Sequence, residues 1–398
     1  MVATDAYDTP LVRVVMVGHV DHGKSTLIGR IRQELAPMVE SSGDNLAFVV
    51  DQLQEERDNL MTIDTTQTVV HTPRGRLVFI DVPGHQELLQ NMLSGATRAD
   101  AAVLVLAADE GVQVQTRRHA LLASLLGLRN LVVVANKMDL ALWREQAFRE
   151  LETLARKELD GLGLNTLAFV PIAATTGANV VSRASEMPWY SGPTLMELLA
   201  DLEPASGPLA AVRLPVQDVY SFDATPVAVG RLLSGRITEG DTLVACPSLQ
   251  RVTVREIRRF PPDHSPAEAG AAVALVLDGA QVARGDVIAG IEGAPAARED
   301  FEARVFWLAS APLALGDEVN LRCATQLVSV RVTAVLDRLD SASLTPLPSG
   351  SQLGRMDLAT VTLHSARSLV VESFVTLPAL GRFTLERGGS PAGFGILP

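Results

Sequence analysis

The chain has 398 residues, which is more than one ordinary hydrophobic core holds, so two or three domains are expected. Apolar residues make up 47% and charged residues 20%, as in globular proteins, and we expect neither a membrane span nor a secretory signal. The net charge of −12 argues against broad non-specific binding to nucleic acid. The two cysteines, Cys246 and Cys323, lack metal-ligand spacing, and we expect reduced thiols in a cytoplasmic protein.

Residues 11–203 alternate apolar strands with helices. Strands that are apolar along most of their length and are joined by helical crossovers indicate a parallel sheet covered on both faces. The pattern predicts an α/β P-loop domain with a mostly parallel, doubly wound sheet over residues 1–203. The expected strands cover residues 11–18, 76–81, 101–109, 130–137 and 165–173, and the expected helices cover residues 24–35, 86–96, 115–126, 143–159 and 194–202.

After a Pro- and Gly-containing linker at residues 203–208, the segments become short and strand-like, with turn residues between them. This pattern predicts two antiparallel β-barrels, one at residues 209–294 and one at residues 299–398. In the second barrel the expected strands cover residues 301–308, 318–324, 328–336, 358–364, 369–377 and 382–386.

Residues 18–25, GHVDHGKS, fit the phosphate-loop pattern G-x-x-x-x-G-K-[ST] between an expected strand and an expected helix. The backbone N–H groups of such a loop bind phosphate, Lys24 is expected on the β- and γ-phosphates, and the Ser25 hydroxyl is expected to ligate Mg²⁺. Only three of the chain's 34 basic residues are lysines, so a lysine here is a specific choice. Nucleotide contacts are predicted for Gly18, His19, Val20, Asp21, His22, Gly23, Lys24, Ser25 and Thr26.

A second motif, DVPGH at residues 81–85, follows an expected strand. Asp81 is predicted to hold Mg²⁺ through water, and the N–H of Gly84 can approach the γ-phosphate because glycine has no side chain. His85 is predicted to orient the attacking water, the alternative being a solvated residue at the start of a helix.

Thr62, between these two motifs, is the candidate that closes over Mg²⁺ and the γ-phosphate in a nucleotide-dependent loop. Other threonines follow closely at residues 65, 66 and 68, so this assignment is less specific than the others. The predicted catalytic residues are therefore Lys24, Thr62 and His85, and the predicted metal ligands are Ser25, Thr62 and Asp81.

NKMD at residues 136–139 ends an expected strand and predicts that the base is guanine. Asp139 can accept hydrogen bonds from both N1–H and the 2-amino group of guanine, and adenine offers no such pair. Lys137 can pack its stem on the base, and Asn136 completes the motif. At the last strand, Ala173 is expected beside the base, and the N–H of Ala174 is expected to donate to the guanine carbonyl. The cofactors predicted are GTP or GDP and Mg²⁺.

The remaining histidines show no ligand spacing, and we expect them to be packed or solvated; they are His71, His119, His264 and His364. His19 and His22 are expected to support the shape of the phosphate loop. The arginines at residues 255, 258 and 259 are expected on a solvated strand face, with a partner contact as the alternative.

GHVDHGKST, DVPGH and NKMD together resemble the elongation factor Tu family of translational GTPases, and GRLLSGRITEGD at residues 230–241 looks like the second-domain barrel of that family. The resemblance covers nearly the whole chain and implies a GTPase domain followed by two barrels.

Within that family, residues 112–140, 187–199 and 381–397 are similar to the GTPase subunit of heterodimeric bacterial sulfate adenylyltransferase. This resemblance implies that GTP hydrolysis drives formation of adenylyl sulfate and pyrophosphate from ATP and sulfate on a smaller partner subunit. The alternatives are a translation factor that carries aminoacyl-tRNA, and a regulatory GTPase of another pathway. Several departures from the family pattern together indicate a divergent member, whose partner or coupled reaction can differ. They include Leu60 where the family's switch has glycine, Leu88 near a usual aromatic position, VDHGKS in the phosphate loop, and Ala173 in place of serine.

Overall fold

The computed structural model describes residues 11–36, 66–81, 99–125, 128, 130–160, 162, 164–202, 211–222, 225–258, 266–348 and 350–398. Two compact units make up the chain: the first comprises Met1–Ser206 and Ala342–Leu344, and the second comprises Gly207–Ser341 and Thr345–Pro398. The predicted linker at residues 203–208 and the predicted helix at residues 86–96 lie outside the described residues. None of the described helices is long and apolar enough to cross a membrane.

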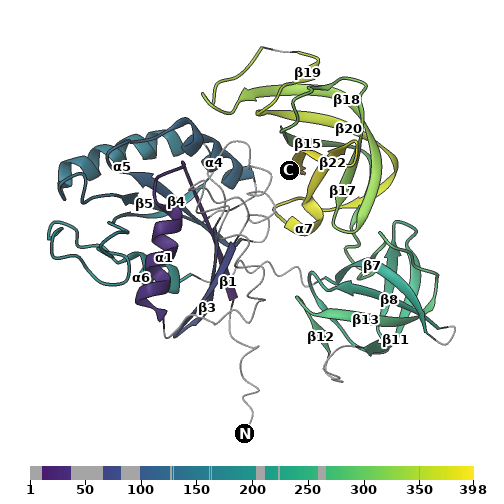
Figure 1. The fold of residues 1–398 in the computed structure, drawn as a ribbon. Helices are drawn as coiled ribbons and strands as arrows, with labels where there is room; N and C mark the ends of the chain where they lie inside the picture. The colour runs from purple at the N-terminus through teal and green to yellow at the C-terminus, as the bar shows by residue number, and fades with distance from the viewer. Residues whose placement is uncertain are drawn as a thin grey trace, which may run out of the picture. The chain divides into compact units, whose positions relative to one another are not determined.

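The first unit contains a six-stranded sheet in the order β2-β3-β1-β4-β5-β6 (Figure 1). All neighbours in this sheet are parallel except β2 and β3, which form an antiparallel hairpin at one edge. The hairpin strand β2 was not among the predicted strands; its sequence, TQTVVHT, has only two apolar residues and so lacks the apolar run that predicted the others. The strands are β1 (Leu11–Gly18), β2 (Thr66–Thr72), β3 (Gly75–Asp81), β4 (Ala101–Ala107), β5 (Asn130–Asn136) and β6 (Asn165–Pro171).

Helices cover both faces of this sheet (Figure 1). They are α1 (Lys24–Glu34), α4 (Val114–Leu125), α5 (Glu145–Leu159) and α6 (Leu195–Ala200). α1 and α6 share one apolar core with the strands, and α4 packs beside α5. The helix predicted from residue 143 begins at Glu145, because Leu142 and Trp143 have φ values of 55° and 58° and cannot continue an α-helix.

The first barrel is closed, and each of its six strands pairs antiparallel with two neighbours. Its order is β10-β11-β13-β8-β7-β14. The strands are β7 (Arg213–Phe222), β8 (Thr225–Arg231), β10 (Thr242–Cys246), β11 (Gln250–Arg258), β13 (Ala272–Gly279) and β14 (Val287–Ala289), with a short pair of β9 (Arg236–Ile237) and β12 (Ala267–Glu268) beside them.

The second barrel is also closed and antiparallel, in the order β15-β20-β18-β17-β21-β22. Residues 369–377 do not form a separate strand as predicted: β20 runs on to Val371, and the chain then turns into the short helix α7 (Pro378–Gly381). The strands are β15 (Ala296–Trp307), β17 (Glu318–Cys323), β18 (Gln326–Asp340), β20 (Asp357–Val371), β21 (Arg382–Arg387) and β22 (Ser390–Ile396), with β16 (Leu313–Ala314) paired to β19 (Gln352–Leu353).

The two barrels share a small apolar cluster within the second unit. The first barrel contributes Val244, Cys246, Val287 and Ala289, and the second contributes Val370, Leu377 and Leu380. Both cysteines are buried free thiols, and burial raises the pKa of the Cys323 thiol to about 12. Neither thiol is therefore a nucleophile at neutral pH.

Candidate nucleotide-binding site

The phosphate loop connects β1 to α1 through a tight turn that only glycine permits at two positions. Gly18 has φ 145° and Gly23 has φ 89°, both in the region that L side chains rarely adopt. A Cβ at residue 18 would lie 2.4 Å from the Val105 carbonyl oxygen, and one at residue 23 would lie 2.4 Å from Nδ2 of Asn136. The two glycines therefore let the loop fold back on β4 and on the end of β5.

Lys24 lies at the start of α1 and is buried. Its Nζ donates to the carbonyl oxygens of Gly18 and His19, at 3.0 and 2.8 Å. Burial lowers the pKa of this ammonium to about 8, against the opposing effect of Asp81 and Asp21. Lys24 therefore lies inside the phosphate loop, and its contact with the β- and γ-phosphates stays a prediction.

Ser25 and Asp81 lie together, although 56 residues separate them in the chain. The Ser25 hydroxyl donates to Oδ2 of Asp81 at 2.8 Å. A hydroxyl and a carboxylate are oxygen ligands of the kind that Mg²⁺ prefers, so these two residues fit the predicted metal site. In the part of the chain that the structure describes, no group of three or more His, Cys, Asp and Glu side chains could hold a metal by itself.

Asn136 connects the phosphate loop to the predicted base-binding loop. Its Nδ2 donates to the His22 carbonyl at 2.8 Å, and its Oδ1 accepts from the N–H of Ala174 at 2.9 Å. The Ala174 N–H, which the sequence assigned to the guanine carbonyl, is therefore engaged with Asn136 here. Both loops are therefore hydrogen-bonded to one buried side chain.

Lys137 and Asp139 extend from the same strand end toward neighbouring loops. Lys137 has φ 62°, and its Nζ lies 2.9 Å from Oε1 of Glu110. Asp139 accepts a hydrogen bond from the Thr175 hydroxyl at 3.2 Å. Ala173 is buried beside them. The structure therefore brings the base-side residues 136, 137, 139, 173 and 174 to one edge of the sheet, and their roles toward guanine stay predictions.

Three further residues of this site were missed by sequence reasoning: Glu110, His119 and Thr175. Glu110 pairs with Lys137 and also lies 3.5 Å from Nε2 of His22. Nδ1 of His119 lies 3.1 Å from the N–H of Gly18. A polar ring on the otherwise apolar helix segment at residues 119–125 was the one signal that could have found His119.

Three predicted residues, Thr62, Gly84 and His85, lie outside the described residues. Among the other loop positions, Asp21 and Thr26 are exposed and Val20 is half-buried. The predictions for the switch threonine and the water-orienting histidine therefore stay predictions.

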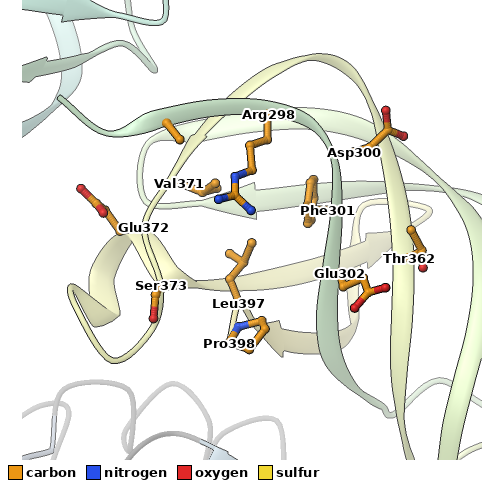
Figure 2. A pocket seen from close by; sticks show the side chains of 11 residues that line it. Arg298, Asp300, Phe301, Glu302, Thr362, Val371, Glu372, Ser373, Leu397 and Pro398 are labelled. Carbon is orange, nitrogen blue, oxygen red and sulfur yellow. The ribbon is translucent and has the colours of Figure 1, made fainter. Parts of the chain in front are cut away.

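A second concavity, of about 550 Å³, lies in the second barrel (Figure 2). None of the predicted site residues lines it. Two of its four charged side chains already have partners: Asp300 contacts His364 at 2.8 Å, and Glu372 contacts Arg213 at 2.7 Å. This hollow does not carry the features of the predicted nucleotide site.

Comparison with known proteins agrees with the class that fold and site define, a P-loop GTPase followed by two β-barrels. Residues 9–205 match the family described as elongation factor Tu GTP binding domain, and residues 300–397 match the GTP-eEF1A C-terminal domain-like family. The chain belongs to the elongation factor Tu-like GTPases. As a member it binds GTP and GDP with Mg²⁺.

The similar curated proteins are elongation factors. Elongation factor 1-alpha of Staphylothermus marinus is 34% identical over 98% of this chain and 96% of its own length. That of Thermococcus sibiricus is 35% identical, with 98% of each chain covered, and that of Pyrococcus furiosus is 34% identical over the same shares. A solved structure, sup35 complexed with GDP, is 26% identical, with 99% of this chain and 95% of that chain covered and a TM-score of 0.46.

These relatives correct the narrower interpretation of the sequence. The prediction of a sulfate adenylyltransferase subunit was wrong, because the curated relatives are elongation factors 1-alpha. The partner prediction, a smaller adenylyltransferase subunit and no nucleic acid, was wrong for the same reason. The segments behind that prediction lie within the residues that the two family models match. Net charge also says little about one face of a protein.

Proposed function

We propose that this chain is a translation factor that binds aminoacyl-tRNA in its GTP-bound state and hydrolyses GTP on the ribosome. The observation that carries the proposal is identity of 34 to 35% to elongation factors 1-alpha across 98% of the chain, both barrels included. A protein that shared only the GTPase core would align over the first unit alone. Work in translation would place the protein in the cytoplasm.

The predicted site residues take their roles in this proposal from general GTPase chemistry. Lys24 neutralises the phosphates, and Ser25, Asp81 and Thr62 hold Mg²⁺, while His85 orients the attacking water. Asn136 and Asp139 select guanine, with Ala174 and Lys137 beside the base. The domain boundaries proposed are residues 1–203, 209–294 and 299–398; β15, the first strand of the second barrel, begins at Ala296, three residues before the proposed third domain.

The test is nucleotide-dependent binding of tRNA to the purified full-length protein. Protein loaded with Mg²⁺ and a non-hydrolysable GTP analogue should protect the ester of aminoacyl-tRNA from alkaline hydrolysis, and protein loaded with GDP should protect it at least tenfold less. Binding should weaken with added salt, because phosphate contacts release counterions. Deacylated tRNA, which has no ester to protect, is the matched control as a competitor for binding.

Equal protection in the GTP-analogue and GDP states would sink the proposal, and so would equal binding of acylated and deacylated tRNA. A Lys24→Ala variant, which should lose nucleotide binding, should also lose protection.

A further inference from the structure

Gly18, the first residue of the phosphate loop, is held on its backbone N–H by a side chain from far along the chain. His119 lies in α4, 101 residues away, and its Nδ1 is 3.1 Å from the Gly18 nitrogen. Both groups are buried, and the His119 ring is fully inaccessible to solvent. Because this N–H is buried, solvent water cannot replace its acceptor, and loss of the acceptor would leave a buried donor unsatisfied.

The direction of this hydrogen bond fixes the state of the imidazole. A backbone amide can only donate, so Nδ1 of His119 must be unprotonated and the ring proton must lie on Nε2. A positive ring could not accept. Burial, reinforced by the nearby charges of Lys24 and other basic groups, lowers the pKa of His119 to about 3, which keeps the acceptor available throughout the neutral range.

The carbonyl of the same residue has a different partner. Nζ of Lys24 donates to the Gly18 oxygen at 3.0 Å. An ammonium has three N–H donors, so Lys24 can keep this bond and still reach phosphate oxygens, as its predicted role requires. Gly18 is therefore held at both of its backbone polar groups, by the Lys24 donor at the carbonyl and by the His119 acceptor at the N–H.

His22, at the other end of the loop, makes the opposite kind of contact. Its Nδ1 lies 3.1 Å from the Val105 carbonyl oxygen, so in this ring Nδ1 carries the proton and donates. Val105 also lies opposite Gly18 in the β1–β4 register. One imidazole accepts and the other donates, and a residue that can only donate or only pack could not replace His119.

We propose that His119 is a positioning residue of the nucleotide site, which holds the entry of the phosphate loop through an acceptor nitrogen and thereby slows nucleotide release. The proposal concerns how the GTP-binding site is held in shape, and it does not depend on the proposed binding of tRNA. Its test uses nucleotide alone, so its failure and the failure of the proposed function are distinguishable.

The experiment compares two amides that place their polar atoms differently. In His119→Asn the amide oxygen sits at the δ position and can replace Nδ1, whereas in His119→Gln the amide lies one bond further from the backbone. The release of a fluorescent GDP analogue from full-length protein with Mg²⁺ is followed by stopped flow. We expect His119→Gln to release it about tenfold faster than wild type, the size that an orphaned buried donor gives, and His119→Asn to stay within about threefold.

Equal release from the Asn and Gln variants, whether slow or fast, would overturn the proposal, because the position of the acceptor would then not matter. Leu122→Ala, which truncates a buried residue of the same helix, is the control for general loosening. It should lower the unfolding midpoint and leave the release rate within about threefold. Faster release from Leu122→Ala, equal to that of His119→Gln, would also overturn the proposal.

A measurement on the wild-type protein tests the same point without any folding risk. Long-range ¹⁵N–¹H correlation spectra of ¹⁵N-histidine protein report which ring nitrogen carries the proton. The proposal requires that, between pH 6 and pH 8, the ring of His119 carries its proton on Nε2 and none on Nδ1. A proton on Nδ1 in that range would refute it.

Discussion

Gly23 ends the phosphate loop and caps α1, and its conformation is set by a neighbour from another strand. With φ at 89° and a Cβ position only 2.4 Å from Nδ2 of Asn136, the site has no room for a side chain. We predict that Gly23→Ala lowers the affinity for GDP at least tenfold, because either the loop or Asn136 must move. Isothermal titration calorimetry measures the change.

The same helix supplies a matched control for this prediction. Gly29 lies within α1 and a Cβ there would meet nothing within 4 Å. Gly29→Ala should leave the affinity unchanged and raise the free energy of unfolding by up to about 1 kcal/mol, since alanine is the better helix former. If both alanine variants bind GDP equally, the steric argument for Gly23 is wrong.

Asp139 should decide which base the site accepts. A carboxylate accepts from the N1–H and 2-amino group of guanine, whereas an asparagine amide would present a donor to the 2-amino group. Xanthine has a carbonyl in that place. We therefore predict that Asp139→Asn weakens GDP binding at least 100-fold and binds xanthosine diphosphate more tightly than GDP, as competition with a fluorescent nucleotide will measure.

The control for that prediction removes only the hydroxyl that contacts Asp139. Thr175 donates to its carboxylate at 3.2 Å from an exposed position. Thr175→Val should change GDP affinity by less than about fivefold. A preference for GDP retained by Asp139→Asn would show that another residue reads the base.

Sequence reasoning predicted residues of this site where a motif fixes both residue type and spacing, as for Ser25 and Asp81, which the structure places within 2.8 Å of each other. It did not identify His119, since that contact depends on how α4 packs beside the end of β1, 101 residues apart. It also did not foresee that the Ala174 N–H is taken by Asn136. Partner choice among nearby groups is a matter of tertiary geometry, and a linear motif does not encode it.

Two buried histidines predict how the stability of the first unit depends on pH. Burial lowers the pKa of both His22 and His119 from 6.5, that of His119 to about 3. The unfolded chain therefore binds protons on these rings below pH 6.5 that the folded chain does not. Their contribution is complete above pH 6.5 and is lost as the pH falls, for His119 down to about pH 3.

We predict that the free energy of unfolding falls between pH 6.5 and pH 5.5, and that His119→Asn removes about 1 kcal/mol of that fall, as expected for one proton. Urea unfolding at the two pH values, followed by tryptophan fluorescence, provides the measurement. The same fall in wild type and variant would mean that His119 is protonated equally in folded and unfolded chains.

At the scale of elements, hydrophobic patterning predicted the described strands of the central sheet except β2, which lies at an edge and has only two apolar residues. Boundaries were less predictable. α5 begins at Glu145 because of the two left-handed residues before it, and β20 absorbs Leu369 into one long strand. Backbone angles and strand length are set by what each segment packs against, so a window of sequence cannot supply them.

A bidentate ion pair between Arg117 and Glu158 joins α4 to α5. Nε and Nη2 of Arg117 donate to the two oxygens of Glu158, at 2.7 and 2.9 Å, with both side chains about three-quarters buried. We predict that Arg117→Ala lowers the free energy of unfolding by about 1 kcal/mol, because bidentate, partly buried pairs exceed the usual surface value. Urea unfolding measures it.

Arg149 provides the comparison, since it also contacts two glutamates but is 54% exposed within α5. Arg149→Ala should cost less than about 0.5 kcal/mol. Equal losses of unfolding free energy in the two variants would show that the ion pair between the helices is no stronger than an exposed pair within one helix.

For the whole molecule, the change from crossover-linked apolar strands to short alternating strands predicted the α/β domain and the two closed barrels. The branch of the family was predicted wrongly, because the segments used, such as residues 112–140, lie in the shared GTPase core. The folding of a core constrains its residues in every member alike. The task that a member performs depends on surface residues, and no single sequence shows which of these are kept.

Within the second unit, the two barrels are joined at a buried arginine. Arg213 of β7 is 2% exposed, and its guanidinium donates to Glu372, just after β20, and to the carbonyl oxygens of Val212 and Gly293. We predict that Arg213→Ala lowers the free energy of unfolding of the barrels by about 3 kcal/mol, because Glu372 would keep its charge without a partner. Arg331→Ala, which breaks an exposed pair with Glu318, should cost less than about 0.5 kcal/mol. Urea unfolding of the full-length variants decides: equal midpoints would mean that Arg213 does not hold the barrels together, whereas an earlier transition confined to the Arg213 variant is the expected result.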